Sequence, residues 1–211
     1  MRSPQPRYSS TWDVSVVLNY IESMQEDEAI SILHLSYKLS TLMILMTAAR
    51  SLELQKLKIS RMIEDKTKFI IDERTKTQRE HHKPVRMIFY KNQISLKLEV
   101  VSSLQCYLKR IKENRKEEDH LFITTTAPFR ATRPTTIANW VKHMMTLAGI
   151  DTKLFRTHSC RAAATLKAKV HGLSIEQTIS VARWSNVKTF KRFYERELRS
   201  ENSFQETLAT K

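Results

Sequence analysis

Residues 156–168, with the sequence RTHSCRAAATLKA, decide how the rest of the chain is interpreted. They contain a His-x-x-Arg pair, His158 and Arg161, at the start of an expected helix. This helix begins at Thr157 or His158. It stops at Gly172, because glycine readily adopts the left-handed conformation found just past a helix end.

Outside this stretch, apolar spacing and capping residues predict a chain rich in helices. Ser174 and Gln177 match a capping box and open the next helix. Residues 1–11 hold two prolines and several small polar residues, which is typical of an arm or linker. A helix follows the arm, with apolar residues Val14, Val17, Leu18 and Ile21 and candidate caps Ser10, Thr11 and Asp13. Further helices are expected over residues 30–49, 52–57, 98–112 and 134–147, and from 187 or 188 onward.

Two short, partly alternating stretches, 66–72 and 85–90, are rich in β-formers, and the polar segment 73–84 lies between them. This pattern predicts a β-hairpin with a long tip. The expected fold class is therefore mainly α with one small antiparallel β-sheet (α+β). The chain has only two glycines, Gly149 and Gly172, which excludes glycine-rich phosphate loops and dinucleotide fingerprints.

Composition indicates a basic, intracellular protein with one sizeable domain. The chain has 211 residues, and its 36 Lys and Arg against 22 Asp and Glu give a formal charge of +14. Two cysteines, Cys106 and Cys160, are too few for a disulfide framework or a cysteine zinc site. No apolar run approaches the ~20 residues that span a bilayer, and no signal-peptide segment is present, so no membrane partner is expected.

The positive charge is concentrated in the last third of the chain. Residues 129–199 hold 14 basic against 4 acidic side chains, whereas residues 1–60 hold six of each. A polyanionic partner would therefore be held mainly by the C-terminal third, through salt-sensitive phosphate contacts. The alternative is a solvated basic face with no such partner.

Six candidate site residues occur in an informative order along the chain. They are Arg50 in TAARSLELQKL, Lys76 in IIDERTKTQRE, His158 and Arg161 in RTHSCRAAATLKA, Trp184 in VARWSN and Tyr194 in KTFKRFYERE. Taken singly, each has an ordinary structural interpretation: a cation near a helix end, a solvated lysine, a helix-start histidine, an ion-paired arginine, or core aromatics. Their combination and order favour a functional interpretation.

This order resembles the catalytic domain of the tyrosine recombinases, the phage integrase family. The steps of 23 residues from Arg161 to Trp184 and of ten to Tyr194 are close to the family's spacing. The sequences around these residues are most similar to those of recombinases of eukaryotic mobile elements, the crypton and DIRS-like groups. The resemblance thus implies a DNA integration and recombination enzyme, nuclear if the source is eukaryotic.

The resemblance also implies a role for each residue. Tyr194 would attack the scissile phosphate and form a 3′-phosphotyrosyl bond. Arg50 and Arg161 would donate to the non-bridging oxygens, and Trp184 would add its indole N–H. His158 would bind the same phosphate and take part in proton transfer from the tyrosine.

Lys76, on the hairpin, would be the general acid for the departing 5′ oxygen, with Lys68 and Arg74 as competitors for that role. The reaction needs no metal and no cofactor. The cluster at 81–83, His-His-Lys, is better interpreted as a charged hairpin than as a set of metal ligands.

The sequence departs from the family's pattern at several places. Ala48 and Ala49 stand where many members have a glycine before the first arginine, and Ala162 replaces a frequent histidine. We expect an arm at residues 1–11, a catalytic domain at 12–199 and a tail at 200–211. The DNA-clamping domain that precedes the catalytic domain in the family is not expected within this sequence.

Double-stranded DNA is the expected partner, and the resemblance implies a homotetramer on two DNA sites. Residues 195–211 would then pack onto a neighbouring subunit, with Leu198, Phe204 and Leu208 as apolar anchors. The alternative is a frayed polar tail. Two rival functions also remain: a binding module that keeps the fold without catalysis, and a type IB topoisomerase.

Overall fold

The computed structural model describes residues 10–63, 68–71, 85–91, 95–182 and 197–198. Three of the predicted site residues, Lys76, Trp184 and Tyr194, lie outside these ranges. The helix expected from residue 187 or 188 lies outside them as well, so the site is built below from Arg50, His158 and Arg161.

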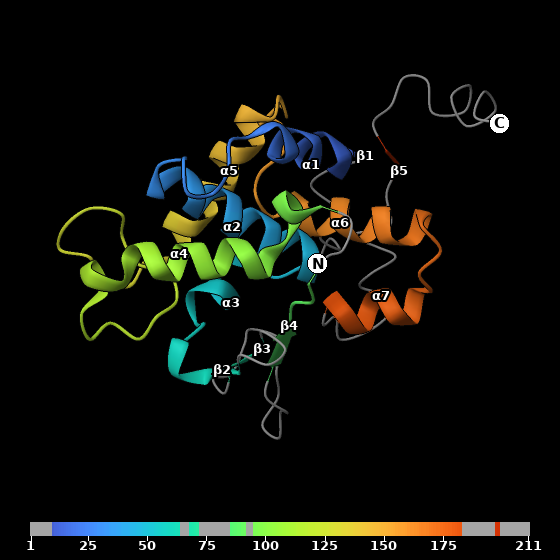
Figure 1. Cartoon of the computed structure of the whole chain (residues 1–211). Coiled ribbons are helices and arrows are strands. Elements are labelled where there is room, and N and C mark those ends of the chain that lie inside the picture. Colours follow the sequence, from blue (N-terminus) through green and yellow to red (C-terminus); the bar gives the residue numbers. More distant parts are fainter. Residues whose placement is uncertain (1–9, 64–67, 72–84, 92–94, 183–196, 199–211) are drawn as a thin grey trace, which may run out of the picture.

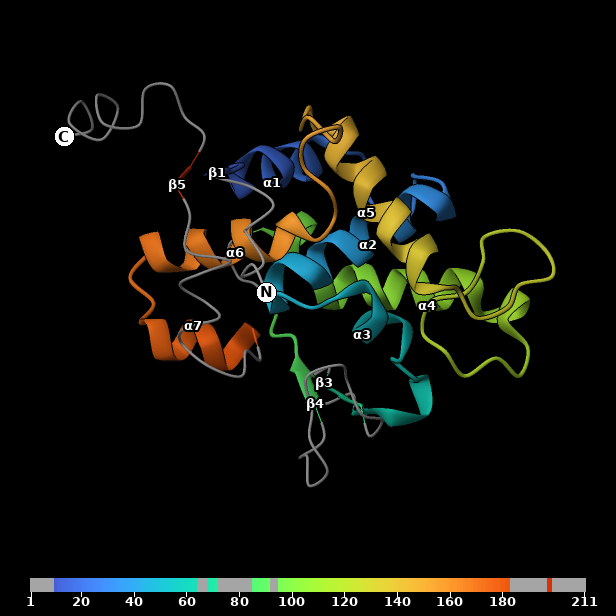
Figure 2. The same ribbon diagram turned by 180° about the vertical axis from the view of Figure 1, so that it is seen from behind.

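The core is organised around one buried helix, α2 (Ile32–Thr47). Ser31 caps it, and the hydroxyl oxygen of Ser31 accepts a hydrogen bond from the backbone N–H of His34 at 3.2 Å. The apolar residues of α2 include Leu35, Leu39 and Leu42, all inaccessible to solvent. Figures 1 and 2 show α2 in the middle of the molecule, with α4 and α5 on opposite sides of it.

Helices α4 (Val100–Arg115) and α5 (Pro134–Leu147) cover α2. Proline at the first position opens α5, as the sequence predicts. Aromatic side chains join these helices: Tyr107 lies 5.7 Å from Phe122, and Phe122 lies 6.0 Å from Trp140, measured between ring centroids. Burial raises the pKa of the Tyr107 phenol to about 12, so this group is neutral and serves the core.

Helix α1 (Val14–Ser23) closes one end of the bundle. Of the three candidate caps, Asp13 is the one used, because its carboxylate accepts a hydrogen bond from the N–H of Ser15 at 2.8 Å. Ser10 and Thr11, which the sequence assigns to the arm, instead form strand β1. They pair in parallel with β5 (Glu197–Leu198), so residues from both ends of the chain meet.

The predicted hairpin is present, with one additional strand. β3 (Lys68–Ile71) and β4 (Val85–Ile88) pair antiparallel, with Lys68 opposite Ile88. A short strand, β2 (Met62–Ile63), adds to the outer edge of β3 and gives the order β2-β3-β4. The segment 72–84, which contains Lys76, Arg74 and the cluster at 81–83, lies outside the described residues.

The last third is helical up to residue 182. α6 (Ser159–Val170) ends before Gly172, whose φ of +90° is the left-handed value predicted for this position. The capping box also forms, because Gln177 donates its N–H to the hydroxyl of Ser174 and its side chain accepts the N–H of Ser174. α7 (Ile175–Ala182) follows and packs on α6 (Figure 1).

The predicted fold class, mainly α with a small antiparallel sheet, is confirmed. Several helix bounds differ from the prediction by one to three residues; the helix expected over 98–112, for example, runs from Val100 to Arg115 as α4. The helix expected over 30–49 ends at Thr47, because Ala48 adopts a left-handed conformation. The next helix, α3 (Ser51–Gln55), begins and ends earlier than the expected 52–57.

A charged loop after α4 holds the segment that leads into the sheet. Arg115 donates through Nη1 to the carbonyl of Glu118 at 2.9 Å and through Nη2 to that of Leu121 at 2.6 Å. The carboxylate of Asp119 accepts the hydroxyl of Ser60 at 2.7 Å and the Ser60 N–H at 2.9 Å. Ser60 lies in the short 3₁₀ helix Ile59–Arg61 that leads into β2, so Asp119 anchors the start of the sheet.

We predict that Asp119→Asn lowers the free energy of unfolding by about 1 kcal/mol at neutral pH, because the two bonds to Ser60 lose their charge. Those two bonds, first the hydroxyl and then the backbone N–H, lower the pKa of Asp119. A carboxylate with a lowered folded pKa stabilises the protein above its unfolded pKa, and this contribution disappears as the pH falls through the folded pKa. Urea denaturation curves of the native protein and the variant should therefore converge as the pH falls below the ordinary pKa of an aspartate.

Glu117→Gln is the matched control, since Glu117 is an exposed neighbour in the same loop. It should change the free energy of unfolding by less than about 0.5 kcal/mol. Equal losses in the two variants would contradict the anchoring role of Asp119.

Candidate active site

Arg50 lies at the N-cap of α3, directly after the turn that ends α2. Its guanidinium Nη1 is 3.1 Å from Oε1 of Glu53, and its backbone N–H donates to Oε2 of the same carboxylate at 3.0 Å. Glu53 is almost fully buried, whereas the Arg50 side chain is 22% exposed. The carboxylate therefore fixes one edge of the guanidinium while the side chain keeps access to solvent.

Among the described residues, Arg161 is the largest fully buried side chain. Its Nη1 donates to the carbonyl of Ala48, and its Nη2 donates to the carbonyl of Ala182 at 2.8 Å. Ala48 is the C-cap of α2, and Ala182 is the last described residue of α7. The positive charge thus sits where two helices present carbonyl oxygens and the negative ends of their dipoles.

The turn at Ala48 binds Arg161 and lies just before Arg50 in the chain. Ala48 has φ 47° and ψ 33°, a left-handed conformation that turns the chain sharply between α2 and Arg50. Its carbonyl binds Arg161, and Arg50 follows two residues later. Both arginines are thereby tied to one backbone turn. Arg161, however, is 1% exposed and both of its Nη atoms are directed to backbone carbonyls, so the arrangement differs from the donation to phosphate oxygens expected from the resemblance.

Three alanines surround this turn. Ala48, Ala162 and Ala182 are all buried and pack against one another, with Ile175 and Ile179 at their margin. Ala162 occupies the place where the family often has a histidine, and in this chain that place is a closely packed contact between α6, α2 and α7. The small side chains allow the three elements to approach closely enough for Arg161 to reach both carbonyls.

His158 lies at the N-cap of α6, one turn before Arg161. It is exposed and lines an open pocket of about 480 Å³ between α5 and the segment before α6. Lys142, Lys153 and Arg156 also line this pocket, and none of its described lining residues is acidic. The hydroxyl of Thr157 donates to the carbonyl of Ala138 at 2.6 Å, which ties the segment to α5.

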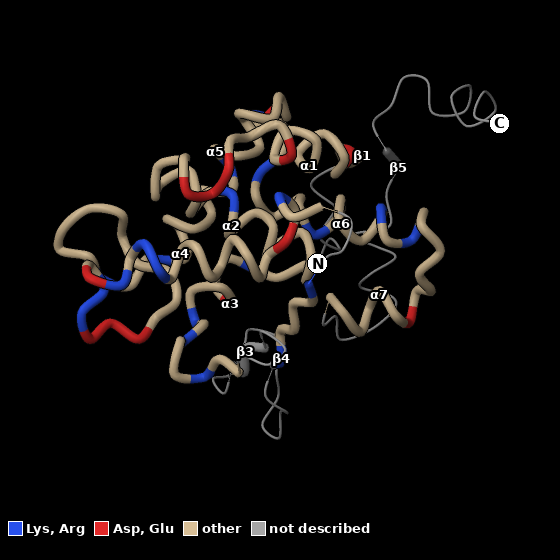
Figure 3. Tube along the Cα trace, in the orientation of Figure 1, with Lys and Arg blue, Asp and Glu red and all other residues tan. Residues whose placement is uncertain are grey.

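Figure 3 shows lysine and arginine along α4 as well as on α6, so positive charge is not confined to the His158 pocket. The pocket nevertheless lies wholly within residues 129–199, the most basic part of the sequence. Its three described cations and His158 form a surface suited to phosphate groups.

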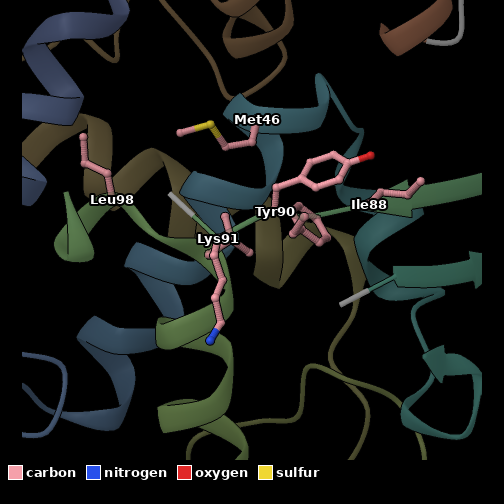
Figure 4. A pocket seen from close by; sticks show the side chains of 7 residues that line it. Met46, Ile88, Tyr90, Lys91 and Leu98 are labelled. Atoms are coloured by element: carbon pink, nitrogen blue, oxygen red, sulfur yellow. The ribbon is translucent and has the colours of Figure 1, made fainter. Parts of the chain in front are cut away.

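A second pocket, of about 340 Å³, lies beside the end of α2 and is mainly apolar (Figure 4). Met46, Ile88 and Tyr90 line it, and Tyr90 is 73% exposed. Lys91 supplies its charged side chain. Arg50, His158 and Arg161, the three described site candidates, are not among its described lining residues.

Cys160 lies inside the His-x-x-Arg box but is not a nucleophile. It is fully buried, and burial raises the pKa of its thiol to about 12. Its Sγ lies 3.6 Å from Sδ of Met145, within the core. A reactive cysteine needs a lowered pKa and access to solvent, and Cys160 has neither.

Sequence reasoning missed Glu53, which holds Arg50. A signal was present, because the carboxylate follows Arg50 by three residues and this spacing matches the second half of a capping box. It also missed the carbonyls of Ala48 and Ala182, for which the sequence carries no signal. Lys76, Trp184 and Tyr194 stay predictions, since they lie outside the described residues.

Two further findings concern the described residues only. They contain no group of three or more His, Cys, Asp or Glu side chains placed to hold a metal ion. None of their helices is long and apolar enough to cross a membrane.

A profile described as the phage integrase family matches residues 17–200. The chain belongs to the phage integrase family. The family assignment made from the motif order is thereby confirmed, whereas the finer crypton or DIRS-like assignment stays a prediction. No curated protein sequence matches the chain.

Solved structures of family members share the fold at low sequence identity. The chain resembles XerA recombinase with a TM-score of 0.66 and 16% identity, over 98% of this chain and 64% of that one. It resembles XerH recombinase, in a post-cleavage complex with its difH DNA, with a TM-score of 0.64 and 13% identity, over 96% and 53%. It also resembles a phage lambda integrase dimer bound to a core site, with a TM-score of 0.57 and 13% identity, over 95% and 64%. The chain thus spans less than two thirds of the length of these three proteins.

We predict that Ala48→Gly leaves the free energy of unfolding within about 0.5 kcal/mol of the native value. Glycine relieves about 1 kcal/mol of left-handed strain. It also removes a buried methyl group worth about 0.8 kcal/mol, so the two effects offset each other. Ala48→Val should instead lower the free energy of unfolding by about 2 kcal/mol or more, because a branched side chain is strained at this φ and overfills the contact with Ala162.

Urea denaturation measures both changes. Ala29→Val, at an exposed turn position, is the control for the added side chain and should change stability by less than about 0.5 kcal/mol. If Ala48→Val lowers the free energy of unfolding no more than Ala29→Val does, the result would contradict the tight left-handed turn.

Proposed function

We propose that this chain is the catalytic part of a site-specific tyrosine recombinase that cuts and rejoins double-stranded DNA. The observation that carries the proposal is the turn at Ala48, whose carbonyl binds Arg161 and which Arg50 follows two residues later. The guanidinium of Arg50, which keeps access to solvent beside this turn, can stabilise the charge of a phosphorane-like transition state without a metal ion, while the buried Arg161 holds the turn. Membership of the phage integrase family supports the same reaction.

In the proposed reaction, Arg50 binds the non-bridging oxygens of the scissile phosphate. Glu53 engages one edge of its guanidinium, and a guanidinium has five N–H donors, so further donors serve the phosphate. Arg161 supplies positive charge and holds the turn that positions Arg50. The carbonyls of Ala48 and Ala182 fix the plane of the Arg161 guanidinium before the substrate arrives.

The proposed chemistry is a transesterification. The oxygen of Tyr194 forms a bond to phosphorus, and the bond from phosphorus to the 5′ oxygen breaks. His158 receives the tyrosine proton, and Lys76 gives a proton to the departing 5′ oxygen. Trp184 donates its indole N–H to the phosphate. Rejoining reverses the step with a 5′-hydroxyl as the nucleophile.

The His158 pocket supports the proposed DNA partner. Its cations would bind backbone phosphates next to the scissile one, since it adjoins the first turn of α6. The exposed face of α5 beside the pocket carries Asn139 and Lys142, side chains that can also bind base edges.

We propose, from the resemblance, that the protein assembles on DNA as a tetramer. The backbone of Leu198, one of three expected anchors for a neighbouring subunit, pairs with that of Thr11 in the same chain. The remaining anchors for trans packing are Phe204 and Leu208. We further propose that the substrate is the DNA of a mobile element, in the nucleus if the source is eukaryotic.

Two alternatives make different predictions. A binding module would hold DNA without forming a covalent adduct. A type IB topoisomerase would relax supercoils without a specific sequence and would not exchange strands between two sites.

We predict that the native chain forms a covalent adduct with nicked suicide duplexes, because loss of the short cleaved strand traps the phosphotyrosyl bond. A pool of nicked duplexes of random sequence, separated on denaturing gels and then sequenced, measures activity and site choice together. Tyr194→Phe should form no adduct. Tyr90→Phe, which removes the hydroxyl of the exposed tyrosine in the apolar pocket, should react like the native chain.

Absence of any adduct from the whole pool, with a native protein that is folded and binds the duplexes, would favour the binding module. An adduct that survives Tyr194→Phe would place the nucleophile elsewhere.

We predict that Lys142→Gln and Lys153→Gln each weaken binding to a ~30-base-pair duplex. Each should also reduce the steepness of the fall of log affinity with log salt concentration by about 1. The reason is that each lysine in the His158 pocket would release about one counterion from a phosphate. Lys109→Gln, an exposed position on α4 across α2 from the pocket, is the matched control and should leave the slope unchanged. Equal slopes for all three variants would exclude the pocket as a DNA contact.

A further inference from the structure

Trp12 makes a buried contact with the helix that carries His158 and Arg161. Its indole Nε1 donates to the hydroxyl oxygen of Ser159 at 2.8 Å, across 147 positions of sequence. Trp12 is 4% exposed and Ser159 is 2% exposed, so water does not compete for this bond. Ser159 is the first residue of α6, immediately after His158.

Helix geometry gives this contact its significance for the site. Successive residues of a helix are separated by about 100° around its axis, so Ser159 and Arg161 point to nearly opposite sides. α6 is therefore held by Trp12 on one side and by the carbonyls of Ala48 and Ala182 on the other. Contacts on opposite sides of a first turn fix the rotation of that turn, and with it the direction of the His158 ring.

A second contact holds the same two elements farther along. Lys167, near the end of α6, donates to the hydroxyl of Ser15 and lies 3.9 Å from the carboxylate of Asp13. These residues start α1, directly after Trp12. The alignment of α6 against the beginning of α1 is thus fixed at two points about two turns apart.

The residues just before Trp12 contact the chain beyond the predicted nucleophile. β1 pairs in parallel with β5, with Ser10 opposite Glu197 and Thr11 opposite Leu198. β5 begins three residues after Tyr194 in the sequence. Residues 10–12 therefore contact both the His-x-x-Arg helix and the strand that follows the nucleophile.

We propose that residues 10–12 form a positioning element for catalysis, in which Trp12 orients His158 and Arg161 through Ser159 and β1 docks the strand that follows Tyr194. This inference rests on the proposed recombinase function. Trp12 touches no reacting atom in this arrangement. Its role is to fix the relative placement of two parts of the site that lie far apart in the sequence.

The test compares single-turnover adduct formation at saturating suicide DNA. Trp12→Phe keeps an aromatic ring and loses the N–H, whereas Ser159→Ala loses the acceptor. Each should slow adduct formation by about tenfold with the DNA dissociation constant unchanged, because one buried hydrogen bond no longer orients the helix. The double variant should be no slower than either single variant, and Ser159→Thr, which keeps a hydroxyl, should restore the rate.

Ser40→Ala is the matched control, since Ser40 is a fully buried serine whose hydroxyl is hydrogen-bonded within α2. It should lower stability to a similar degree and leave the rate of adduct formation unchanged. Native rates for Trp12→Phe and Ser159→Ala, or an equal loss of rate in Ser40→Ala, would overturn the proposal while leaving the recombinase function intact.

A readout independent of activity separates this inference from the function. Amide hydrogen exchange in the first turn of α6, residues 159–163, should accelerate in Trp12→Phe and stay native in Ser40→Ala. If the native chain forms no adduct, the proposed function fails, and the exchange data still decide whether Trp12 holds this turn.

The role of β1 has its own test. A disulfide between Ser10→Cys and Glu197→Cys, which are Cα partners in the parallel register, would lock β5 onto β1 in one subunit. The oxidised protein should form the adduct within about twofold of its reduced rate, because the lock keeps the proposed active arrangement. Slowing of tenfold or more on oxidation, reversed by reduction, would show that β5 must leave β1 and would overturn its docking role.

Discussion

The hydrogen bond from Arg161 to the carbonyl of Ala48 is the contact on which the candidate active site depends. A buried guanidinium requires partners, and here the partners are the carbonyls at the ends of two helices. The same bond fixes the left-handed turn from which Arg50 emerges. One interaction therefore stabilises a buried charge and the turn between the end of α2 and Arg50.

The elements around this contact are adapted to it. Alanines at positions 48, 162 and 182 leave room for close approach, and Glu53 holds the second arginine from the other direction. Trp12 donates a hydrogen bond to Ser159 on the opposite side of α6. The His158 pocket extends from the same helix start and carries the cations proposed to bind DNA. The arrangement is preorganised, because its polar contacts are made by the protein before any phosphate is bound.

Much of the fold was predictable because its signals are local. The capping box at Ser174 and Gln177, the glycine at 172 and the proline at 134 each act within one helical turn, and each is found as predicted. The pairing of Ser10 and Thr11 with residues 197 and 198 was not predictable, because parallel pairing joins segments far apart in the sequence and no local pattern specifies the partner. Glu53 lay between these cases, with a local spacing that indicated a cap but not the arginine side chain it also binds.

The sequence by itself determined the family, the order of the candidate residues and the mainly helical fold class, because motif order and apolar spacing are properties of the chain alone. Only the tertiary structure decided that Arg161 binds the turn just before Arg50, since its partner there is a backbone carbonyl that every residue possesses and no sequence marks. It likewise decided that Trp12 reaches Ser159 across 147 positions. Contacts of this kind arise from how packed helices are placed in space, and packing is a property of the whole core.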